Sequence, residues 1–286
     1  MLTAGTRQVV NRKRKSALCA GTFGPVIGIS RPSIASLLLE PQFQGTAVST
    51  ATGFVVERNQ RRYLVTNFHV VSGRNPDTHA SLDPSGTWPD AIRVWHHAAG
   101  PLGQKWTGKS EPLYDAQGVP LWLEHPVHHS KVDVVALPLT NTADITIYEY
   151  DPWAPVRVAI NVAGPLSIVG FPFGLIYGGV MAVWVQGFVA SEWGIDFGNL
   201  PRFLIDSRTR EGQSGSPVIF HSASGSFRDV KGNTVIASGP TDEFVGVYSG
   251  RISKESDLGF VWKGSALCEI IENGVRGTVS APEFLT

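Results

Sequence analysis

The 286-residue chain contains only two cysteines, Cys19 and Cys268. Two cysteines are too few to hold a small secreted fold together through disulfide bonds. Neither lies in a C-x-x-C pair or at a spacing typical of zinc ligands. We therefore expect no disulfide framework, no metal centre and no other cofactor.

Charged residues are also scarce, and their signs balance. Lys and Arg number 24, Asp and Glu number 24, and all four together make up 17% of the chain, against roughly 25% in an average globular protein. A nucleic-acid-binding domain usually carries a strongly basic face or stripe, so we expect no nucleic-acid partner. The 42% hydrophobic fraction excludes generic disorder, and the 31 glycines follow no period of three, which excludes collagen.

The sequence lacks a convincing transmembrane helix. The uncharged stretch 158–191 is long enough to cross a bilayer, but it contains six glycines and two prolines that would interrupt any long helix. Buried strands and turns explain the stretch better, so no membrane span is expected.

The N-terminus resembles a targeting signal only weakly. A basic run, Arg12–Lys15, precedes the uncharged residues Ser16–Ser30, in the order found in signal peptides. The basic run starts late, however, and Gly21, Gly24, Pro25 and Gly28 interrupt the apolar stretch. We expect a cytoplasmic protein, with export through this weak N-terminal signal as the alternative.

From Gly45 onward the chain is rich in Thr, Val and aromatic residues divided by turn residues, which is typical of strands. Short strands at spacings of about 8–12 residues favour antiparallel barrels or a sandwich. Ser36–Leu39 are expected to form a short helix, and Ala266–Asn273 form a longer one that begins after Ser265 and ends at Gly274. The expected strands are 45–57, 62–71, 92–95, 121–123, 132–139, 156–160, 166–171, 180–190, 203–206, 216–220, 244–252 and 260–262, with loops at 72–90 and 98–120.

The strongest chemical signal is the segment Glu211–Pro217, in which Ser214 is flanked by glycines. A serine that attacks an ester or amide needs nearby backbone N–H groups to receive the developing oxyanion. The N–H groups of Gly212 and Ser214 are the candidate donors.

A serine nucleophile also needs a histidine base, which is oriented by a carboxylate. After Ser214 only His221 follows, inside the next expected strand, so the order Ser–Asp–His fails. No aspartate precedes His69, so the order Asp–His–Ser fails as well. The order His–Asp–Ser remains: His69 lies at the end of an apolar strand, and Asp133 opens another. His69, Asp133 and Ser214 are therefore the predicted catalytic residues.

Five segments together resemble trypsin-like (chymotrypsin-fold) serine proteases of the bacterial HtrA-type branch. They are 66–71 (TNFHVV), 133–137 (DVVAL), 168–175 (IVGFPFGL), 186–191 (QGFVAS) and 212–217 (GQSGSP). The resemblance implies an all-β fold of two six-stranded antiparallel barrels of the chymotrypsin type, with the triad in the cleft between them and a C-terminal helix. It divides the chain into a leader (1–40), a peptidase domain (41–275) and a tail (276–286), and no PDZ domain is expected.

The function implied by this resemblance is that of a serine endopeptidase, which hydrolyses peptide bonds through an acyl-enzyme. Its substrates would be proteins or peptides, and a regulatory partner protein is a further expectation. A non-catalytic binding module and an esterase on the same fold remain alternatives, because they would share these residues.

Substrate binding is predicted for two regions. Tyr248, Ser249 and Gly250 resemble the segment that pairs with a substrate backbone as an added strand, with Gly250 leaving room for a side chain. Arg208 stands six residues before Ser214, where a trypsin-like pocket would have its specificity residue; it would there favour an acidic substrate side chain, with a solvated or paired arginine as the alternative.

Two further features bear on function. The histidines of 125–129 and the pair His96–His97 have the composition of metal ligands, but the 125–129 stretch contains a proline and lacks the H-E-x-x-H pattern of hydrolytic zinc sites. In many animal trypsin-like enzymes, an aspartate before the nucleophile pairs with a newly freed N-terminal ammonium. Gln213 occupies that position here and carries no charge, so activation by a new N-terminus is not expected.

Overall fold

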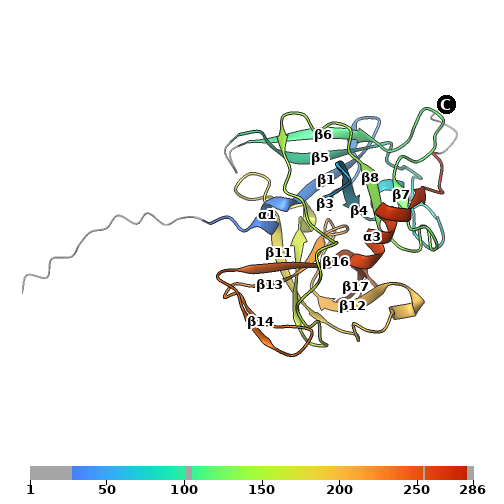
Figure 1. Ribbon diagram of the computed structural model, residues 1–286. Helices are drawn as coiled ribbons and strands as arrows, with labels where there is room; N and C mark the ends of the chain where they lie inside the picture. The colour runs from blue at the N-terminus through green and yellow to red at the C-terminus, as the bar shows by residue number, and fades with distance from the viewer. Residues whose placement is uncertain (1–27, 101–104, 254, 282–286) are drawn as a thin grey trace, which may run out of the picture.

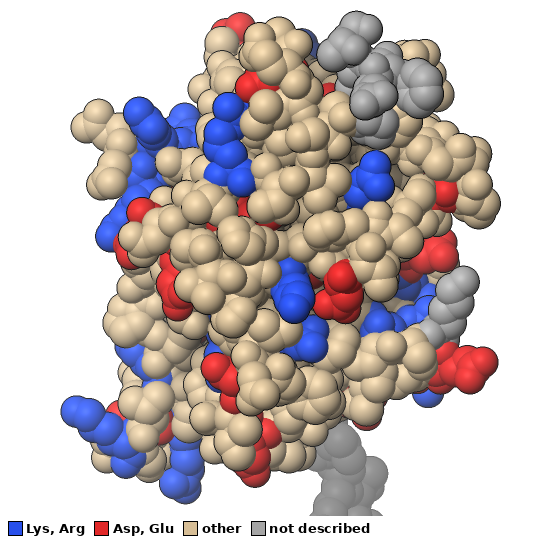
Figure 2. All heavy atoms as spheres, turned by 90° about the vertical axis from the view of Figure 1, so that its right-hand side faces the viewer, with Lys and Arg blue, Asp and Glu red and all other residues tan. Residues whose placement is uncertain are grey.

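The computed structural model describes residues 28–100, 105–253 and 255–281 (Figure 1). The basic run Arg12–Lys15, Cys19 and most of the stretch that suggested export lie outside these residues. No helix within the described ranges is long and apolar enough to cross a membrane. On the face shown in Figure 2, Lys and Arg side chains are interspersed with Asp and Glu.

The N-terminal half is an antiparallel sheet, with strands in the order β18-β7-β8-β4-β3-β1-β5-β6 and with β2 and β9 paired at its side. Its elements are α1 (Arg31–Ala35), β1 (Ser36–Phe43), β2 (Thr46–Ala47), β3 (Ala51–Arg58), β4 (Arg61–Thr66), α2 (Phe68–Ser72), β5 (Ala91–Ala98), β6 (Trp106–Pro112), β7 (Leu123–Glu124), β8 (Val135–Pro138) and β9 (Ile145–Thr146), joined from the far end of the chain by β18 (Val275–Arg276).

The C-terminal half is a closed six-stranded antiparallel barrel in the order β10-β11-β12-β17-β16-β13. Its elements are β10 (Pro165–Gly170), the 3₁₀ turn η1 (Pro172–Gly174), β11 (Val183–Val189), η2 (Phe197–Asn199), β12 (Arg202–Ser207), β13 (Pro217–Ser222), β14 (Ser226–Arg228), β15 (Thr234–Ile236), β16 (Thr241–Arg251), β17 (Leu258–Lys263) and the helix α3 (Gly264–Asn273). The expected all-β architecture with a C-terminal helix is confirmed. Of the two expected barrels, only this one closes through the strand pairings of the described residues.

A shared apolar core holds the two halves together. Successive side chains of a strand point to opposite faces, so β3 contributes Val55 to a core within the N-terminal half and Phe54 to a core shared with the barrel. The Phe54 ring lies 5.2 Å from the ring of Tyr150 and 5.4 Å from that of Phe244 on β16. The buried face of α3, which includes Leu267, joins the same core. The shared core therefore fixes how the sheet and the barrel face each other.

The expected boundary at residue 40 is wrong, because it falls inside a central strand. Ser36–Phe43 form β1, which pairs with both β3 and β5, and Leu39 is fully buried. A short continuous apolar run such as Leu37–Leu39 has no periodicity that separates a helix from a buried strand. The expected tail likewise begins inside β18, whose Val275 and Arg276 pair with Glu124 and Leu123.

Four other local expectations need correction. His69 lies in the short helix α2 rather than at the end of a strand. The stretch 156–160 is irregular apart from one bridge at Val158, whereas β6 forms inside the expected loop 98–120. The final helix begins at Gly264, one residue before Ser265. Gly274 does end it, and a side chain there would meet the Ile270 carbonyl oxygen at 2.1 Å.

Candidate active site

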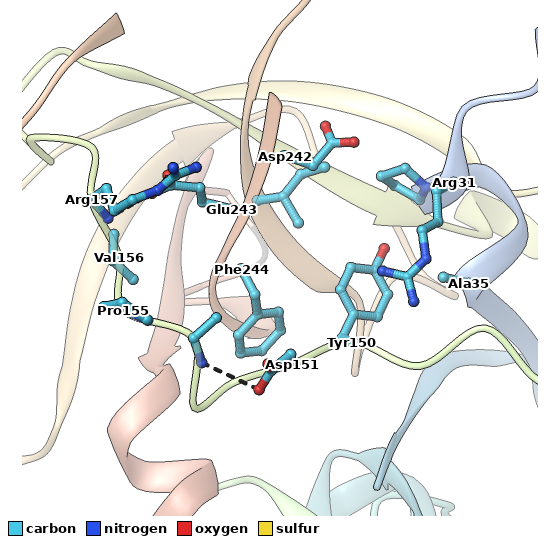
Figure 3. Close-up of a pocket in the computed structure, with 13 residues that line it drawn as sticks. Arg31, Ala35, Tyr150, Asp151, Pro155, Val156, Arg157, Asp242, Glu243 and Phe244 are labelled. Atoms are coloured by element: carbon cyan, nitrogen blue, oxygen red, sulfur yellow. Dashed lines mark hydrogen bonds and ion pairs between the residues drawn. The ribbon is translucent and has the colours of Figure 1, made fainter. Parts of the chain in front are cut away.

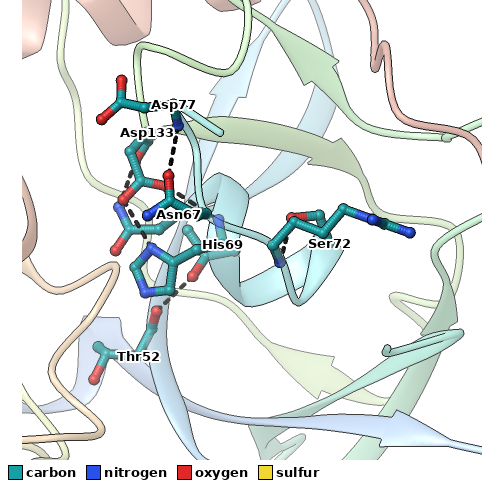
Figure 4. Close-up of polar contacts among 9 residues, drawn as sticks. Thr52, Asn67, His69, Ser72, Asp77 and Asp133 are labelled. Carbon is teal, nitrogen blue, oxygen red and sulfur yellow. Dashed lines mark hydrogen bonds and ion pairs between the residues drawn. The ribbon is translucent and has the colours of Figure 1, made fainter. Parts of the chain in front are cut away.

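His69 and Asp133 form a tightly bonded pair in the N-terminal half (Figure 4). The ring nitrogen Nδ1 of His69 lies 2.7 Å from Oδ2 of Asp133, and the backbone N–H of His69 donates to Oδ1 at 3.0 Å. Asn67, just before α2, donates its side-chain amide to the Asp133 carbonyl at 2.6 Å. Asp133 is only 6% exposed, so its charge is compensated by hydrogen bonds, as a buried carboxylate requires.

This arrangement sets the protonation of the imidazole ring. An ionised carboxylate only accepts hydrogen bonds, so Nδ1 carries the proton and Nε2 is left to accept one. Burial lowers the pKa of His69, whereas the charge of Asp133 and its hydrogen bond raise it, and the net shift is upward from 6.5. His69 is thereby poised to take up a proton at Nε2.

Ser214 lies on a tight turn between β12 and β13 that only glycines can shape. Gly212 and Gly215 have φ angles of +90° and +84°, which L side chains rarely adopt. A Cβ at Gly212 would lie 2.3 Å from the Phe171 carbonyl oxygen, and one at Gly215 would lie 2.2 Å from that of Thr52. The turn is therefore pressed against both β3 and the segment after β10.

The backbone of the turn is anchored on both sides of Ser214. The Ser214 carbonyl accepts the Thr52 N–H at 2.9 Å, and the Gly215 N–H donates to the Tyr248 carbonyl at 2.9 Å. Within the described ranges, the N–H groups of Gly212 and Ser214 donate to no protein acceptor. These two donors are thus left free, as an oxyanion site requires.

His69 and Ser214 come together in one open pocket of about 770 Å³ at the junction of the two halves. It is lined by residues 47–51, which connect β2 to β3, by His69, Val70 and Gly73, by Leu82, Asp83, Pro84, Thr87 and Pro89, and by Glu211, Gly212 and Ser214. The structure therefore brings together four predicted site residues: His69, Gly212 and Ser214 line the pocket, and Asp133 is bonded to His69.

The predicted substrate-binding residues differ in how well their surroundings in the structure suit that role. Tyr248 is buried in the barrel core, its hydroxyl contacts that of Thr209, and its N–H and C=O pair with Ser216 and Gly215. The prediction that Tyr248 pairs with substrate is therefore corrected, because its polar groups are already used.

Ser249 is also buried. At Gly250, φ is +142° and a Cβ would meet nothing within 4 Å, so space is open there. Arg208 is exposed just beyond β12 and lies outside the lining of the His69–Ser214 pocket. The open space at Gly250 fits its predicted part in substrate binding, and the part of Ser249 stays a prediction.

Gln213 is fully buried beneath the turn. Its Oε1 accepts the Arg210 N–H at 2.9 Å, and its own N–H donates to the Arg210 carbonyl at 3.2 Å. Both the side chain and the backbone of Gln213 are thus hydrogen-bonded to the backbone of Arg210.

The histidine clusters serve structural contacts. His125 is buried, its Nε2 lies 3.1 Å from Glu269, and its Nδ1 accepts the N–H groups of Val127 and His128. His97 is buried and donates from Nε2 to the Ile34 carbonyl at 3.0 Å. Across the described residues, no group of three or more His, Cys, Asp or Glu side chains could hold a metal ion.

A second cavity, of about 290 Å³, lies between α1, the segment 150–157 and β16 (Figure 3). Neither His69 nor Ser214 lines it. Its charged groups are largely engaged: Arg157 pairs with Glu243 at 2.8 Å, and Asp242 pairs with His221 at 2.7 Å. This cavity is therefore separate from the pocket that His69 and Ser214 line.

A family model described as a trypsin-like peptidase domain matches residues 51–227. The chain belongs to the trypsin-like peptidase family. A serine endoprotease from Yersinia pestis is similar in fold (12% identity, TM-score 0.48, covering 85% of this chain), and the present chain spans 63% of its length. The active form of the Rv3671c protease from M. tuberculosis is also similar (14% identity, TM-score 0.43, 87% of this chain and 85% of that chain). No curated protein sequence matches this one.

Sequence reasoning missed residues of this trypsin-like domain that hold the site from behind. Asn67 steadies the Asp133 main chain, and Thr52 contacts the Ser214 turn from β3. Asn67 lies in the same motif as His69, 66–71 (TNFHVV), and this position was a signal that it belongs to the site. Nothing local marks Thr52, which is distant from Ser214 in sequence.

The His69–Asp133 pair predicts a specific titration. Replacing Asp133 with Asn should lower the pKa of His69, because the burial that lowers it remains while the carboxylate charge that raises it is lost. Proton NMR titration of the imidazole signals measures this, with the His69 signal assigned by its loss in His69→Ala. Asp242→Asn is the matched control, because Asp242 lies 2.7 Å from a different histidine, His221. An unchanged His69 pKa in Asp133→Asn would contradict the assignment.

Proposed function

We propose that this protein is a serine endopeptidase in which Ser214 is the nucleophile, His69 the general base and acid, and Asp133 the group that orients His69. The observation that carries the proposal is the bonding of both Asp133 oxygens to His69, which leaves Nε2 free in the pocket that Ser214 shares. A carboxylate that fixes a histidine beside a serine is the arrangement that activates a hydroxyl.

In the proposed reaction, Ser214 Oγ bonds to the carbonyl carbon of a peptide bond while its proton passes to His69 Nε2. The carbonyl oxygen becomes an oxyanion, which the N–H groups of Gly212 and Ser214 stabilise. His69 then gives its proton to the leaving amine as the C–N bond breaks, and an acyl-enzyme remains. A water molecule then gives a proton to His69 as its oxygen bonds to the acyl carbon. The bond from that carbon to Ser214 Oγ breaks, His69 returns the proton to Oγ, and the second product leaves as a carboxylic acid.

We infer that the turn is ordered by its own contacts rather than by a freed N-terminal ammonium. Gln213 stands beneath the turn, and a neutral amide offers no charge to offset the desolvation of a buried ammonium. Its hydrogen bonds to Arg210 supply order locally.

The nucleophile is tested by substitution and by labelling. Ser214→Ala or His69→Ala should lower kcat for a cleaved peptide by on the order of 10⁶, and the double variant should lose little more, because the residues act as a unit. A fluorophosphonate should label the wild-type protein at Ser214 and leave Ser214→Ala unlabelled. Ser49→Ala is the matched control, since Ser49 is a second serine that lines the same pocket.

The outcomes separate three readings. Labelling with peptide cleavage supports the endopeptidase, and labelling with ester cleavage alone indicates an esterase. A folded wild-type protein that is neither labelled nor active indicates a binding module and contradicts the proposal.

The ordering of the turn is tested with a chain that begins at Gly28, because a start near residue 41 would remove half of β1. Full-length protein and the shortened chain, with its amine free or acetylated, should have kcat/KM values within about twofold of one another, since no ion pair at Gln213 is at stake. Gln213→Ala should lower kcat, because the Arg210 N–H loses its acceptor. Activity found only with the free amine of a shortened chain would refute this mode of ordering.

A further inference from the structure

Thr52 contacts the nucleophile turn through both its backbone and its side chain. This fully buried residue of β3 donates its N–H to the Ser214 carbonyl at 2.9 Å and its hydroxyl to the Gly212 carbonyl at 2.8 Å. The same hydroxyl accepts the Phe171 N–H at 3.0 Å. One side chain of the N-terminal sheet therefore joins two segments of the C-terminal half.

These contacts determine how the peptide groups around Gly212 are turned. The Phe173 N–H donates to the Glu211 carbonyl at 2.6 Å. In a trans peptide the N–H points opposite to the C=O, so this bond turns the Gly212 N–H away from Phe173. By binding the Gly212 carbonyl, Thr52 fixes the peptide group that follows Gly212. By accepting the Phe171 N–H, it also anchors the segment that contains Phe173.

Glycine makes this anchoring necessary. With no Cβ, Gly212 can populate alternative backbone conformations at little cost, so its own sequence does not hold the N–H in one direction. A buried carbonyl without a partner is costly, and the hydroxyl of Thr52 is the group that satisfies the Gly212 carbonyl in its present orientation.

We propose that Thr52 is a positioning residue for the oxyanion site: its hydroxyl holds Gly212 with its N–H free to receive the oxyanion. This inference rests on the proposed function. Thr52 itself touches neither the substrate nor the reacting atoms.

Three substitutions test the role of Thr52. Thr52→Val keeps the shape and removes the hydroxyl, and it should lower kcat by about 10- to 100-fold, less than the full loss of an oxyanion donor. KM should change little, and the rate of fluorophosphonate labelling should fall in parallel with kcat. Thr52→Ser keeps a hydroxyl and should restore most of the rate. Thr66→Val is the matched control: its buried hydroxyl donates only to the Thr52 carbonyl, at 2.9 Å.

The comparison of these variants decides the matter. If Thr52→Val is as active as Thr66→Val, or Thr52→Ser as slow as Thr52→Val, the positioning role is wrong while the endopeptidase proposal stands. If the folded wild-type protein neither cleaves nor labels, the endopeptidase proposal falls, and the role of Thr52 falls with it. Thermal unfolding of each variant confirms that the protein compared is folded.

A separate observation concerns the substrate. The pocket beside Ser214 extends along the loop 82–89 and the connection 47–51 between β2 and β3, and residues 248–250 do not line it. A peptide bound across Ser214 would therefore enter this groove on one side of the cleaved bond only. Among the lining residues, all of which the structure describes, the acidic side chains are Asp83 and Glu211, and no Lys or Arg occurs.

The two carboxylates lack cationic partners among the described residues. Hydrogen bonds from the hydroxyl and N–H of Ser85, both at 2.6 Å, lower the pKa of Asp83, so it stays ionised. Val48 and Leu82 expose 43% and 52% of their surface in the same groove. Apolar surface beside a carboxylate suits a lysine or arginine, whose stem packs while its head pairs.

We infer that the groove selects a substrate with a lysine or arginine on one side of the cleaved bond. This inference also rests on the proposed function. A peptide library with Lys placed at each position should show kcat/KM higher by about two- to fivefold at one or two positions on a single side. Asp83→Asn and Glu211→Gln should each reduce that preference, and 0.5 M salt should weaken it, because exposed charges are screened. Asp206→Asn, an exposed carboxylate outside the groove, should leave the preference intact.

Peptide cleavage without a basic preference, or a preference unaffected by both substitutions, overturns the selectivity alone. Absence of any cleavage by the folded wild-type protein refutes the proposed function and the selectivity with it.

Discussion

The site depends on a contact between the backbones of the nucleophile turn and β3 that leaves no room for a side chain on the turn. Where the nucleophile turn meets β3, a Cβ at Gly215 would lie 2.2 Å from the Thr52 carbonyl oxygen, and the Thr52 N–H bonds the Ser214 carbonyl. His69 comes from the sheet and Ser214 from the barrel, so their meeting requires the two halves to approach at a fixed distance. Glycine permits that approach, and the shared apolar core around Phe54 maintains it.

Charge is used sparingly, and its placement follows from burial. Asp133 is buried and would be costly unpaired, yet both of its oxygens accept hydrogen bonds from His69. Beneath the turn the chain has Gln213, which satisfies the Arg210 N–H without bringing a charge into the interior. The pocket carboxylates Asp83 and Glu211, which pair with no cation among the described residues, are instead exposed, where water screens them. Glu111, Glu124 and Glu243 are buried as well, and each accepts hydrogen bonds, so these buried carboxylates lie where donors meet them.

The sequence predicts the parts of the site that short motifs encode. His69, Asp133 and Ser214 each lie in a recognisable segment, and the all-β class follows from the strand pattern. The path of β1 was missed because Leu37–Leu39 are apolar in a row, so periodicity cannot distinguish a buried strand from a helix. Tyr248 was assigned to substrate binding from its neighbours, yet the side chain faces the barrel core and its backbone groups pair with Gly215 and Ser216.

The role of Thr52 cannot be predicted from the residues next to it in the sequence. Its neighbours in sequence identify it as a residue of a buried strand, and a threonine there satisfies ordinary β preferences. Its hydroxyl acquires a role only because a segment some 160 residues away folds back against it. Such a contact follows from the packing of sheet on barrel, which depends on the whole apolar pattern at once. Candidate catalytic groups can therefore be proposed from short motifs, whereas the groups that hold them in place emerge only with the tertiary structure.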